Sequence, residues 1–381
     1  MDISKISLNH EEMGRYARHI IIPEFGLEGQ LKLKKARVLV IGSGGLGSPV
    51  LLYLAAAGVG HIGIVDFDTV DSSNLQRQVL FTVNDIGKSK AEVAKERLLA
   101  LNPNIEVEVF KTRFTKENAL EIIQNYDVVA DGTDNFPTRY LVNDACVIAG
   151  KVNVYASIFR FEGQVSVFNY LNQDGSRGPN YRDMFPEPPP PGLVPNCAEG
   201  GVLGVLPGII GSLQANEVIK VITGVGEPLA GRIFLFDAAS FTTRILKVSR
   251  QNTEPITQLI NYEQFCGVEE TVEATPVKEI SVTELHRLRE DKADFQLIDV
   301  REPHEYSIAN LGGELIPLAT VAEAVNKISR DKIVVVHCRS GVRSAKAIRE
   351  LERLFDFKNL YNLKGGILAW SKEIDSEIPA Y

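Results

Sequence analysis

Hydrophobic and polar positions follow two alternating patterns along the first two thirds of the chain. From residue 35 onward, short runs rich in β-branched residues are separated by segments with the apolar spacing of helices. The expected strands are 37–41, 61–65, 105–110, 127–130, 152–155, 164–168, 231–236 and 243–248. The helices recognised by their periodicity are 88–101, 115–124 and 137–148. This order is typical of a doubly wound, Rossmann-like α/β sheet.

A second, shorter α/β alternation follows a polar stretch of weak periodicity at 249–276. Its expected elements are a helix at 281–290, strands at 295–300 and 332–337, and a helix at 343–354. We therefore place a first domain at 1–255, a linker at 256–276 and a smaller α/β domain at 277–381. The proline-rich segment 186–195 predicts a surface loop, because proline lacks the N–H that helices and central strands use.

Composition and charge exclude several classes of protein. The 381 residues are 44% hydrophobic and 24% charged, which is typical of folded globular domains. A net charge of −8 without a long basic run disfavours nucleic-acid binding. The first twenty residues lack the apolar core of a signal peptide, and the apolar segment 200–213 is too short to span a bilayer. We expect a cytoplasmic protein without a membrane span.

A glycine-rich segment follows the first expected strand and opens a helix. Gly42, Gly44 and Gly47 form a GxGxxG pattern in GSGGLG, which also contains Gly45. In this position the helix N–H groups and the positive end of the helix dipole face a phosphate. Asp66 ends the next strand, where a carboxylate can hold ribose hydroxyls. The pattern predicts a nucleotide site, but NAD enzymes share these features.

The segments after Asp66 favour ATP over NAD. Arg77 and Lys90 are suited to neutralising a triphosphate or a leaving pyrophosphate, and Asp134 is suited to holding Mg²⁺. Together these groups are the components of nucleotidyl transfer by positioning and electrostatics. An NAD-binding dehydrogenase would need a catalytic base, and none is evident among the histidines of the first domain.

The first domain resembles the MoeB/ThiF-type family, which activates ubiquitin-like sulfur-carrier proteins and is related to ubiquitin-activating enzymes. The resemblance covers about residues 10–250 and rests on the segments RYARHI, GSGGLGS, DFDTVDSSNLQRQ, GKSKAE, DGTDNFPTRY, EGQVSVF and VPNCAEGG. It implies that ATP is contacted by Gly45, Asp66, Ser73, Asn74, Leu75, Gln76, Arg77, Lys90, Asp134 and Asn135. Arg15 and Arg77 match phosphate-facing arginines of the family, whose sites are completed by a partner subunit. This match implies a homodimer.

The resemblance also implies a reaction. The C-terminal Gly-Gly carboxylate of the carrier attacks the α-phosphate of ATP, which gives an acyl-adenylate and pyrophosphate. Cys197, in VPNCAEGG, matches a family cysteine with two alternative roles. It either takes the acyl group as a thioester, or it forms or resolves a disulfide-linked acyl intermediate. Cys146 lies inside an expected helix and is interpreted as a core residue.

The second domain contains its own candidate nucleophile. Cys338 follows an expected strand and begins the loop CRSGVRS, which runs into a helix. Helix N–H dipoles, together with Arg339 and Arg343, should stabilise its thiolate. From about 276 to 381 the domain resembles the rhodanese sulfurtransferases, which implies a persulfide on Cys338. Four residues separate Cys338 from Arg343, one fewer than in the related phosphatases, and this spacing favours sulfur transfer over dephosphorylation.

Two further matches concern structure rather than chemistry. Asp299 and Arg301 match a rhodanese DVRE motif that we expect to hold the domain together. Many relatives of the first domain bind zinc through two CxxC pairs, but this chain has NYRD at 180–183 and EQFC at 263–266. One thiol with Asn and carboxylates is a poor tetrahedral zinc set, so we expect no structural zinc. The loop 174–191 must then be held by packing or by a hydrogen-bonded network.

The favoured function is that of a two-domain, ATP-dependent enzyme. It would adenylate a ubiquitin-like sulfur carrier and then deliver persulfide sulfur to make a thiocarboxylate, with a donor such as a cysteine desulfurase loading Cys338. By resemblance the product would feed molybdopterin synthesis, with thiamine, cysteine or tRNA thiolation also open. One alternative is an activator that conjugates a ubiquitin-like protein through a Cys197 thioester. Another is a non-catalytic nucleotide-binding scaffold that carries an active rhodanese.

Overall fold

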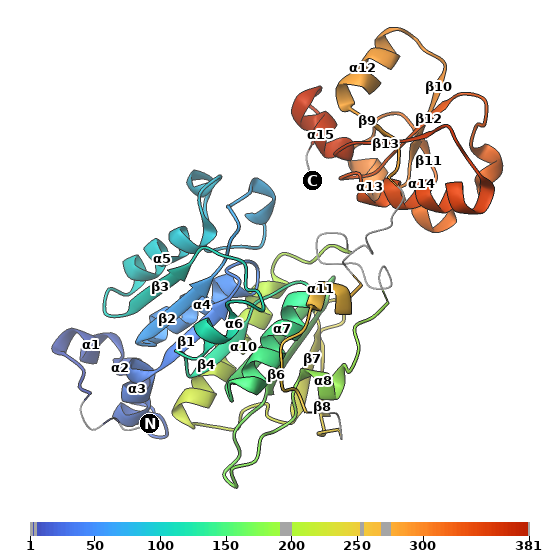
Figure 1. Cartoon of the computed structure of the whole chain (residues 1–381). Helices are drawn as coiled ribbons and strands as arrows, with labels where there is room; N and C mark the ends of the chain where they lie inside the picture. Colours follow the sequence, from blue (N-terminus) through green and yellow to red (C-terminus); the bar gives the residue numbers. More distant parts are fainter. Residues whose placement is uncertain (1–2, 4–5, 191–199, 252–254, 268–275, 380–381) are drawn as a thin grey trace. The chain divides into compact units, whose positions relative to one another are not determined.

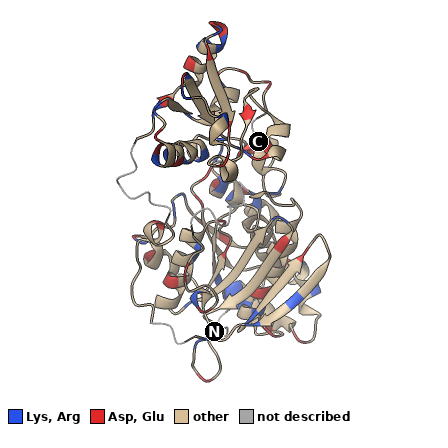
Figure 2. Ribbon diagram, turned by 90° about the vertical axis from the view of Figure 1, so that its right-hand side faces the viewer, with Lys and Arg blue, Asp and Glu red and all other residues tan. Residues whose placement is uncertain are grey.

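The computed structural model describes residues 3, 6–190, 200–251, 255–267 and 276–379. The chain divides into two compact units, 1–269 and 270–381 (Figure 1). Each unit is built on a sheet of its own. Basic and acidic residues are interspersed along the ribbon of both units (Figure 2), so the net charge of −8 is not gathered in one segment.

The first unit contains an eight-stranded sheet with the order β3-β2-β1-β4-β5-β6-β7-β8. The strands are β1 (Arg37–Ile41), β2 (His61–Val65), β3 (Glu106–Phe110), β4 (Val128–Asp131), β5 (Val152–Phe159), β6 (Glu162–Phe168), β7 (Arg232–Asp237) and β8 (Thr242–Lys247). Pairs from β3 to β5 are parallel, and pairs from β5 to β8 are antiparallel. The predicted α/β fold is confirmed, with an antiparallel extension on one side.

Helices cover both faces of this sheet, because its central strands are apolar on both sides. On β1, Val38 and Val40 contribute to one core, and Leu39 and Ile41 contribute to the other. The first core includes residues of α3 (Gly26–Lys35), α4 (Gly47–Ala57), α5 (Lys90–Leu101) and α10 (Leu206–Thr223). The second core includes residues of α6 (Ala119–Ile123), α7 (Phe136–Ile148), α8 (Tyr181–Met184) and α11 (Tyr262–Phe265). Helices α1 (His10–Arg15) and α2 (Ala17–Ile20) precede α3.

The apolar segment 200–213 leads into α10, which packs across the first core. Pro207 lies in the first turn of this helix, where a missing N–H leaves no hydrogen bond unmade. A Cβ on Gly211 would lie 2.7 Å from the Leu46 carbonyl oxygen, so glycine allows α10 to approach α4 closely. Within the described ranges, no helix is long and apolar enough to cross a membrane.

The first unit extends into the segment that the sequence assigns to the linker. Helix α11 lies at 262–265, and Tyr262 and Cys266 are buried in the second core. These two side chains are 3% and 6% exposed. The packing of Tyr262 and Cys266 could not be predicted from the polar composition of 256–276, because the buried residues there are few and follow no helical or strand period.

The second unit is a five-stranded parallel sheet with the order β11-β10-β12-β13-β9. Its strands are β9 (Glu279–Ile280), β10 (Phe295–Asp299), β11 (Glu314–Leu315), β12 (Ile333–His337) and β13 (Leu360–Leu363). Its helices are α12 (Val282–Glu290), α13 (Pro303–Ile308), α14 (Val342–Phe355) and α15 (Gly366–Glu373). Residues of α14 belong to one core, and residues of α12 and α15 belong to the other. The second expected α/β domain is therefore present.

Candidate functional site

The first candidate site lies at the carboxyl ends of β1 and β4. In the strand order, β2 and β3 continue from one side of β1, and β4 and β5 lie on its other side. Connections leaving β1 and β4 therefore run in opposite directions and open a crevice between them. A Cβ on Gly42 would lie 3.0 Å from the carbonyl oxygen of Gly132. The two glycines thus let the turns 42–47 and 131–135 approach each other closely at the carboxyl ends of β1 and β4.

Asp66 holds the glycine-rich turn in shape. Its Oδ2 accepts hydrogen bonds from the Ser43 N–H at 2.8 Å and from the Ser43 hydroxyl at 2.7 Å. Gly42 has φ +87°, a conformation that favours glycine, and a Cβ on Gly47 would overlap the Gly42 carbonyl oxygen. Asp66 Oδ1 accepts from the Asp68 N–H, which leaves capacity on the carboxylate for one more donor.

The segment 73–78 lines the same turn. It begins within the 3₁₀ turn η1 (Ser72–Asn74) and holds the predicted residues Ser73, Asn74, Leu75, Gln76 and Arg77. A Cβ on Gly45 would lie 4.0 Å from Arg77 Cγ, and one on Gly44 would lie 3.4 Å from Gln78 Nε2. The Arg77 guanidinium donates to the Ser73 carbonyl oxygen at 3.0 Å.

Gln78 is a residue of this segment that the sequence analysis did not single out. It is 5% exposed, and its Oε1 has no hydrogen-bond partner among the described residues. A buried acceptor left unpaired is costly, so a hydroxyl or amino group of a bound nucleotide fits this place. Its adjacency to Arg77 in DFDTVDSSNLQRQ was the available signal.

Lys90 and Asp134 complete the polar lining. Lys90 begins α5, is 5% exposed, and places its Nζ 3.1 Å from Asp68 Oδ2. Asn135 caps α7 by accepting from the Thr138 N–H at 3.0 Å, and the preceding Asp134 is exposed. The predicted nucleotide-site residues from Gly42 to Asn135 are therefore grouped near the carboxyl ends of β1 and β4, whereas Arg15 is not.

Two buried charged residues support the Asp134 turn, and sequence reasoning missed both. Asp131 Oδ1 accepts from the Thr133 N–H and hydroxyl, and Arg139 donates to the Thr133 carbonyl oxygen at 3.2 Å. Burial raises the pKa of the Asp131 carboxyl, an effect opposed by the charge of Arg139. Asp131 stands in DGTDN, but its burial is decided by the packing of β5 and α7.

The carboxylate of Asp134 fits Mg²⁺ held together with phosphates. Among the described residues, no group of three or more His, Cys, Asp or Glu side chains forms a metal cage. Mg²⁺ is usually bound by one or two carboxylates, substrate phosphates and water, and it does not need such a cage. One exposed carboxylate beside the crevice meets that requirement.

Arg15 lies near the amino ends of the parallel strands, whereas the glycine-rich turn lies at their carboxyl ends. Its guanidinium donates to the Leu101 carbonyl oxygen at 3.0 Å and contacts Glu11 at 3.4 Å. Leu101 ends α5, which runs from the carboxyl end of β2 back to the amino end of β3. Arg15 is therefore far from the glycine-rich turn of its own chain.

A polar network lies around the segments 180–183 and 263–266, which the sequence analysis compared with zinc-binding CxxC pairs. Arg182 on α8 donates to Asp144 on α7 at 2.9 and 2.7 Å, and the Tyr262 hydroxyl donates to the same carboxylate at 2.8 Å. The Arg182 guanidinium also lies 4.7 Å from the ring centre of Phe265. Asp183 already accepts from the Gln251 N–H at 2.6 Å. This donor set does not fit tetrahedral zinc.

The second candidate site is the turn between β12 and α14. Cys338 is fully buried, and its Sγ lies 3.1 Å from the Gly341 N–H and 3.4 Å from the Ser344 hydroxyl. Gly341 has φ +94° and begins the helix, and a Cβ on Gly366 would come within 2.6 Å of the Arg339 carbonyl oxygen. The loop therefore directs polar hydrogens at the sulfur. Sequence reasoning did not identify Ser344.

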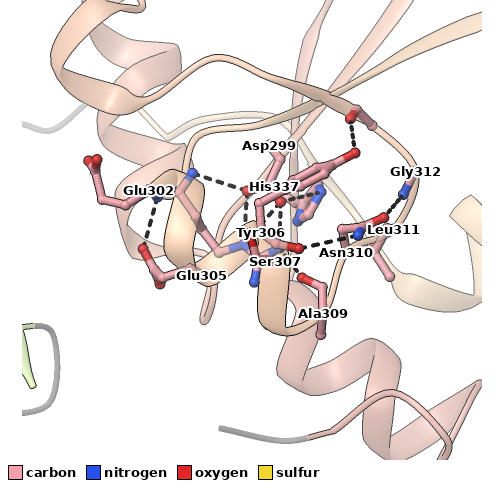
Figure 3. Close-up of polar contacts among 12 residues, drawn as sticks. Asp299, Glu302, Glu305, Tyr306, Ser307, Ala309, Asn310, Leu311, Gly312 and His337 are labelled. Carbon is pink, nitrogen blue, oxygen red and sulfur yellow. Dashed lines mark hydrogen bonds and ion pairs between the residues drawn. The ribbon is translucent and has the colours of Figure 1, made fainter.

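Arg343 is tied to another element. Its two terminal nitrogens donate to the Glu305 carboxylate on α13 at 2.7 and 2.6 Å. Glu305 also accepts from the Glu302 N–H at the start of α13 (Figure 3). The charge of Arg343 near the loop is thus compensated by Glu305. Arg343 fixes the loop to α13 as well as carrying charge.

Beneath the loop, Asp299 and Arg301 form a fully buried ion pair. Arg301 also donates to the Ala309 carbonyl oxygen at 2.8 Å. His337 lies beside Asp299 (Figure 3), with Nε2 3.6 Å from Asp299 Oδ2. Neither of its ring nitrogens has a hydrogen-bond partner within the part of the chain that the structure describes. Burial lowers the pKa of His337 to about 4.

The other cysteines differ from Cys338 in their surroundings. Burial raises the pKa of the Cys266 thiol to about 11, and it raises the pKa of Cys146 still further. Both thiols therefore stay protonated at neutral pH. The predicted Cys197 site lies outside the described residues.

Both units match known families. Residues 16–260 match the ThiF family, and residues 281–373 match the rhodanese-like domain. The "Probable adenylyltransferase/sulfurtransferase MoeZ" of Mycobacterium tuberculosis is 49% identical over 381 residues, covering 98% of this chain and 97% of that protein. The "Sulfur carrier protein adenylyltransferase" of Thermus thermophilus is 54% identical over 265 residues, covering 68% of this chain and 98% of that protein.

A solved structure shares the fold of the first unit. The crystal structure of E. coli MccB with ATP superimposes with a TM-score of 0.53 and 26% sequence identity. The match covers 64% of this chain and 73% of that chain.

Proposed function

The chain belongs to the ThiF family and carries a rhodanese-like domain, and we propose that it is an adenylyltransferase and sulfurtransferase acting on a ubiquitin-like sulfur carrier. The names of the Mycobacterium and Thermus relatives support both activities and the carrier. The observation that carries the proposal is the close approach of Gly42 and Gly132, which joins the glycine-rich turn to the Asp134 turn. The same chain holds Cys338 beneath loop donors.

The first step needs alignment and charge neutralisation rather than a covalent enzyme nucleophile. A carboxylate oxygen of the carrier's terminal glycine bonds to the α-phosphorus of ATP, and the bond to the pyrophosphate oxygen breaks. Arg77 and Lys90 offset the charge of the phosphates, and the helix start at Gly47 directs N–H groups at them. Mg²⁺ bound with the phosphates at Asp134 would supply further neutralisation of the leaving pyrophosphate.

The second step transfers sulfur. A persulfide donor, such as a cysteine desulfurase, loads Cys338, and the outer sulfur then attacks the acyl carbon of the adenylate with release of AMP. The acyl group is then joined to Cys338 through an S–S bond. Attack of a second thiol on Sγ of Cys338 breaks that bond, which releases the thiocarboxylate and leaves a disulfide that an external thiol reduces. Because the acyl-adenylate hydrolyses, a persulfide tethered to the same chain is favoured by its effective concentration. Cys197 stays a candidate for either a thioester or a disulfide-linked acyl intermediate. The thiocarboxylate product would serve molybdopterin synthesis first, with the other sulfur pathways as further cases.

The position of Arg15 supports a homodimer. In its own chain this guanidinium lies near the amino ends of the parallel strands, and the glycine-rich turn lies at their carboxyl ends. A phosphate contact by Arg15 would therefore have to be made in the site of a second copy. We further propose that this dimer acts in the cytoplasm.

The decisive experiment is pyrophosphate–ATP exchange by the purified chain. We expect exchange with a carrier ending in Gly-Gly, and none with the same carrier lacking its last glycine. Asp134→Asn keeps the size of the side chain and should reduce exchange by about two orders of magnitude, because one charge at the phosphates is lost. Exchange that is indifferent to the carrier tail would contradict the proposed substrate. Normal exchange in Asp134→Asn would contradict the proposed magnesium site.

A further inference from the structure

The hydroxyl of Ser344 has more acceptors than it has protons. Ser344 is fully buried in the first turn of α14. Its Oγ lies 3.4 Å from Cys338 Sγ, 3.1 Å from the Gly341 carbonyl oxygen and 2.6 Å from Asn362 Oδ1 on β13. A serine hydroxyl donates one hydrogen. The three acceptors therefore compete for it.

The outcome of this competition depends on the state of the sulfur. As a thiol or a persulfide, Sγ of Cys338 is uncharged and a weak acceptor, so the hydrogen goes to the nearer Asn362 Oδ1. As a thiolate, Sγ carries a full charge, and hydrogen bonds to an ion are roughly twice as strong as neutral ones. The hydroxyl then turns from Asn362 to Sγ.

We propose that Ser344 is a catalytic residue of the sulfur-transfer site that donates to the Cys338 thiolate, with Asn362 as its resting acceptor. The proposal rests on the proposed function and adds a residue to that site. The Gly341 N–H, 3.1 Å from Sγ, is the second donor to the same atom. Because Cys338 is fully buried, these two donors replace the water that would otherwise solvate the charge.

The step served is the loading of sulfur. The Sγ thiolate attacks the outer sulfur of a donor persulfide R–S–SH, so that the Sγ–S bond forms and the donor S–S bond breaks. The donor leaves as R–S⁻, and the proton stays on the transferred sulfur. In the reverse sense, cyanide takes the outer sulfur from the Cys338 persulfide anion and leaves as thiocyanate, which regenerates the thiolate. Ser344 stabilises the thiolate that begins one step and ends the other.

Other charged or titratable groups also lie around the loop. They come from the loop itself, from α13, β10 and β12, and from the turn before α15: Arg339, Arg343, Glu305, Asp299, Arg301, His337 and Lys364. All of them are retained when only Ser344 or Asn362 is changed. A comparison of these variants with the wild type therefore isolates the hydroxyl.

The test uses the full-length chain and alkylation of Cys338 by iodoacetamide, followed on its own peptide by mass spectrometry between about pH 5 and 9. In Ser344→Ala, the pH of half-maximal alkylation should rise by about one unit, since a hydrogen bond to an ion is lost. In Asn362→Ala, it should fall or stay the same, because the competing acceptor is gone. Ser371→Ala removes a buried hydroxyl that donates to the Ile378 carbonyl oxygen, and it should change nothing.

A second readout is sulfur transfer from cysteine persulfide to cyanide, which should slow about tenfold in Ser344→Ala. Fluorescence of Trp370, the single tryptophan of the chain, reports whether each variant keeps the second unit folded. An unchanged alkylation profile in Ser344→Ala would overturn the proposal. So would shifts of the same sign in Ser344→Ala and Asn362→Ala, which would indicate a structural effect. Failure of the wild type to load sulfur, with the shifts as expected, would instead overturn the proposed sulfur transfer.

Discussion

At the scale of single residues, buried carboxylates hold the loops of both sites in place through hydrogen bonds and ion pairs. Asp66 holds Ser43 in the glycine-rich turn, and Asp131 holds Thr133 beside Asp134. In the second unit the Asp299 and Arg301 pair lies under the Cys338 loop. A buried polar group is retained only where its hydrogen bonds are made. Gln78 Oε1 and the ring nitrogens of His337 are buried and have no such partner among the described residues. Each therefore either binds a ligand in the working protein or lowers the free energy of unfolding.

His337 predicts a pH dependence of stability in the second unit. Its pKa is lowered to about 4 in the folded chain by burial, against the ordinary value of 6.5. As the pH falls below about 6.5, His337 binds a proton in the unfolded chain but stays neutral in the folded chain. The free energy of unfolding should thus fall by about 3 kcal/mol between the two pKa values and then level off.

Urea unfolding followed by Trp370 fluorescence measures this effect, because that tryptophan lies in α15 of the second unit. His337→Asn cannot take up the proton and serves as the control. We expect its unfolding free energy to be flatter over the same pH range. An equal slope in the variant would assign the pH dependence to other groups.

At the scale of elements, the main device is the network that ties α7, α8 and α11 together. Arg182, Asp144 and Tyr262 come from three helices, two of which have only four residues. A helix of one turn has little stability of its own, so its position depends on such contacts. The first unit thereby keeps residues 255–267 against its second core.

Arg182→Met should destabilise the first unit by about 3 kcal/mol, because it leaves the buried Asp144 carboxylate without its cation. Calorimetry gives the transition of the first unit, and hydrogen exchange in α8 and α11 should rise. Arg177→Met, which removes a donor to the Asn169 carbonyl oxygen, is the matched control and should cost less than about 1 kcal/mol.

The same network predicts that EDTA leaves the transition temperature of the wild type unchanged. A lower transition temperature in EDTA would show that a metal ion stabilises these helices after all.

At the scale of the whole molecule, the two chemistries are placed on separate units with separate cores. Cys338→Ala should therefore leave carrier-dependent pyrophosphate exchange at the wild-type rate and abolish thiocarboxylate formation. Mass spectrometry of the carrier, which gains the mass difference between sulfur and oxygen, measures the second activity. A loss of exchange in this variant would contradict the division of labour.

Sharing of Arg15 between copies can be tested by mixing two inactive variants. Arg15→Ala and Asp134→Ala each lack one component of every site when they are alone. In equal mixtures about half of the dimers are mixed, and each mixed dimer regains one intact site if Arg15 acts in the partner copy. Exchange should then recover to about a quarter of the wild-type rate. No recovery, after exchange of subunits has been verified, would place Arg15 in its own chain's site.

Patterns local in the chain were enough to predict much of this molecule. The predicted strands 37–41 and 61–65 agree with β1 and β2 residue for residue, since both are apolar runs bounded by turns. The turn at Gly42 and the loop at Cys338 were also recognisable, because their residue types and spacing lie within a few positions. Helix α6 is shorter than the predicted 115–124, as the Asn118 side chain accepts from the Thr115 N–H and delays the helix start.

Only the tertiary structure decided which distant residues meet. Gly132 reaches Gly42 because β4 pairs with β1. Arg343 reaches Glu305 because α13 follows β10, α14 follows β12, and these two strands are paired. Likewise, Ser344 meets Asn362 only because β13 lies beside β12. Periodicity reports the environment of a residue within its own element, whereas these contacts depend on strand order and helix packing. The chain by itself thus determined the fold class and the chemistry-bearing residues, and the packing of distant elements determined how those residues are held.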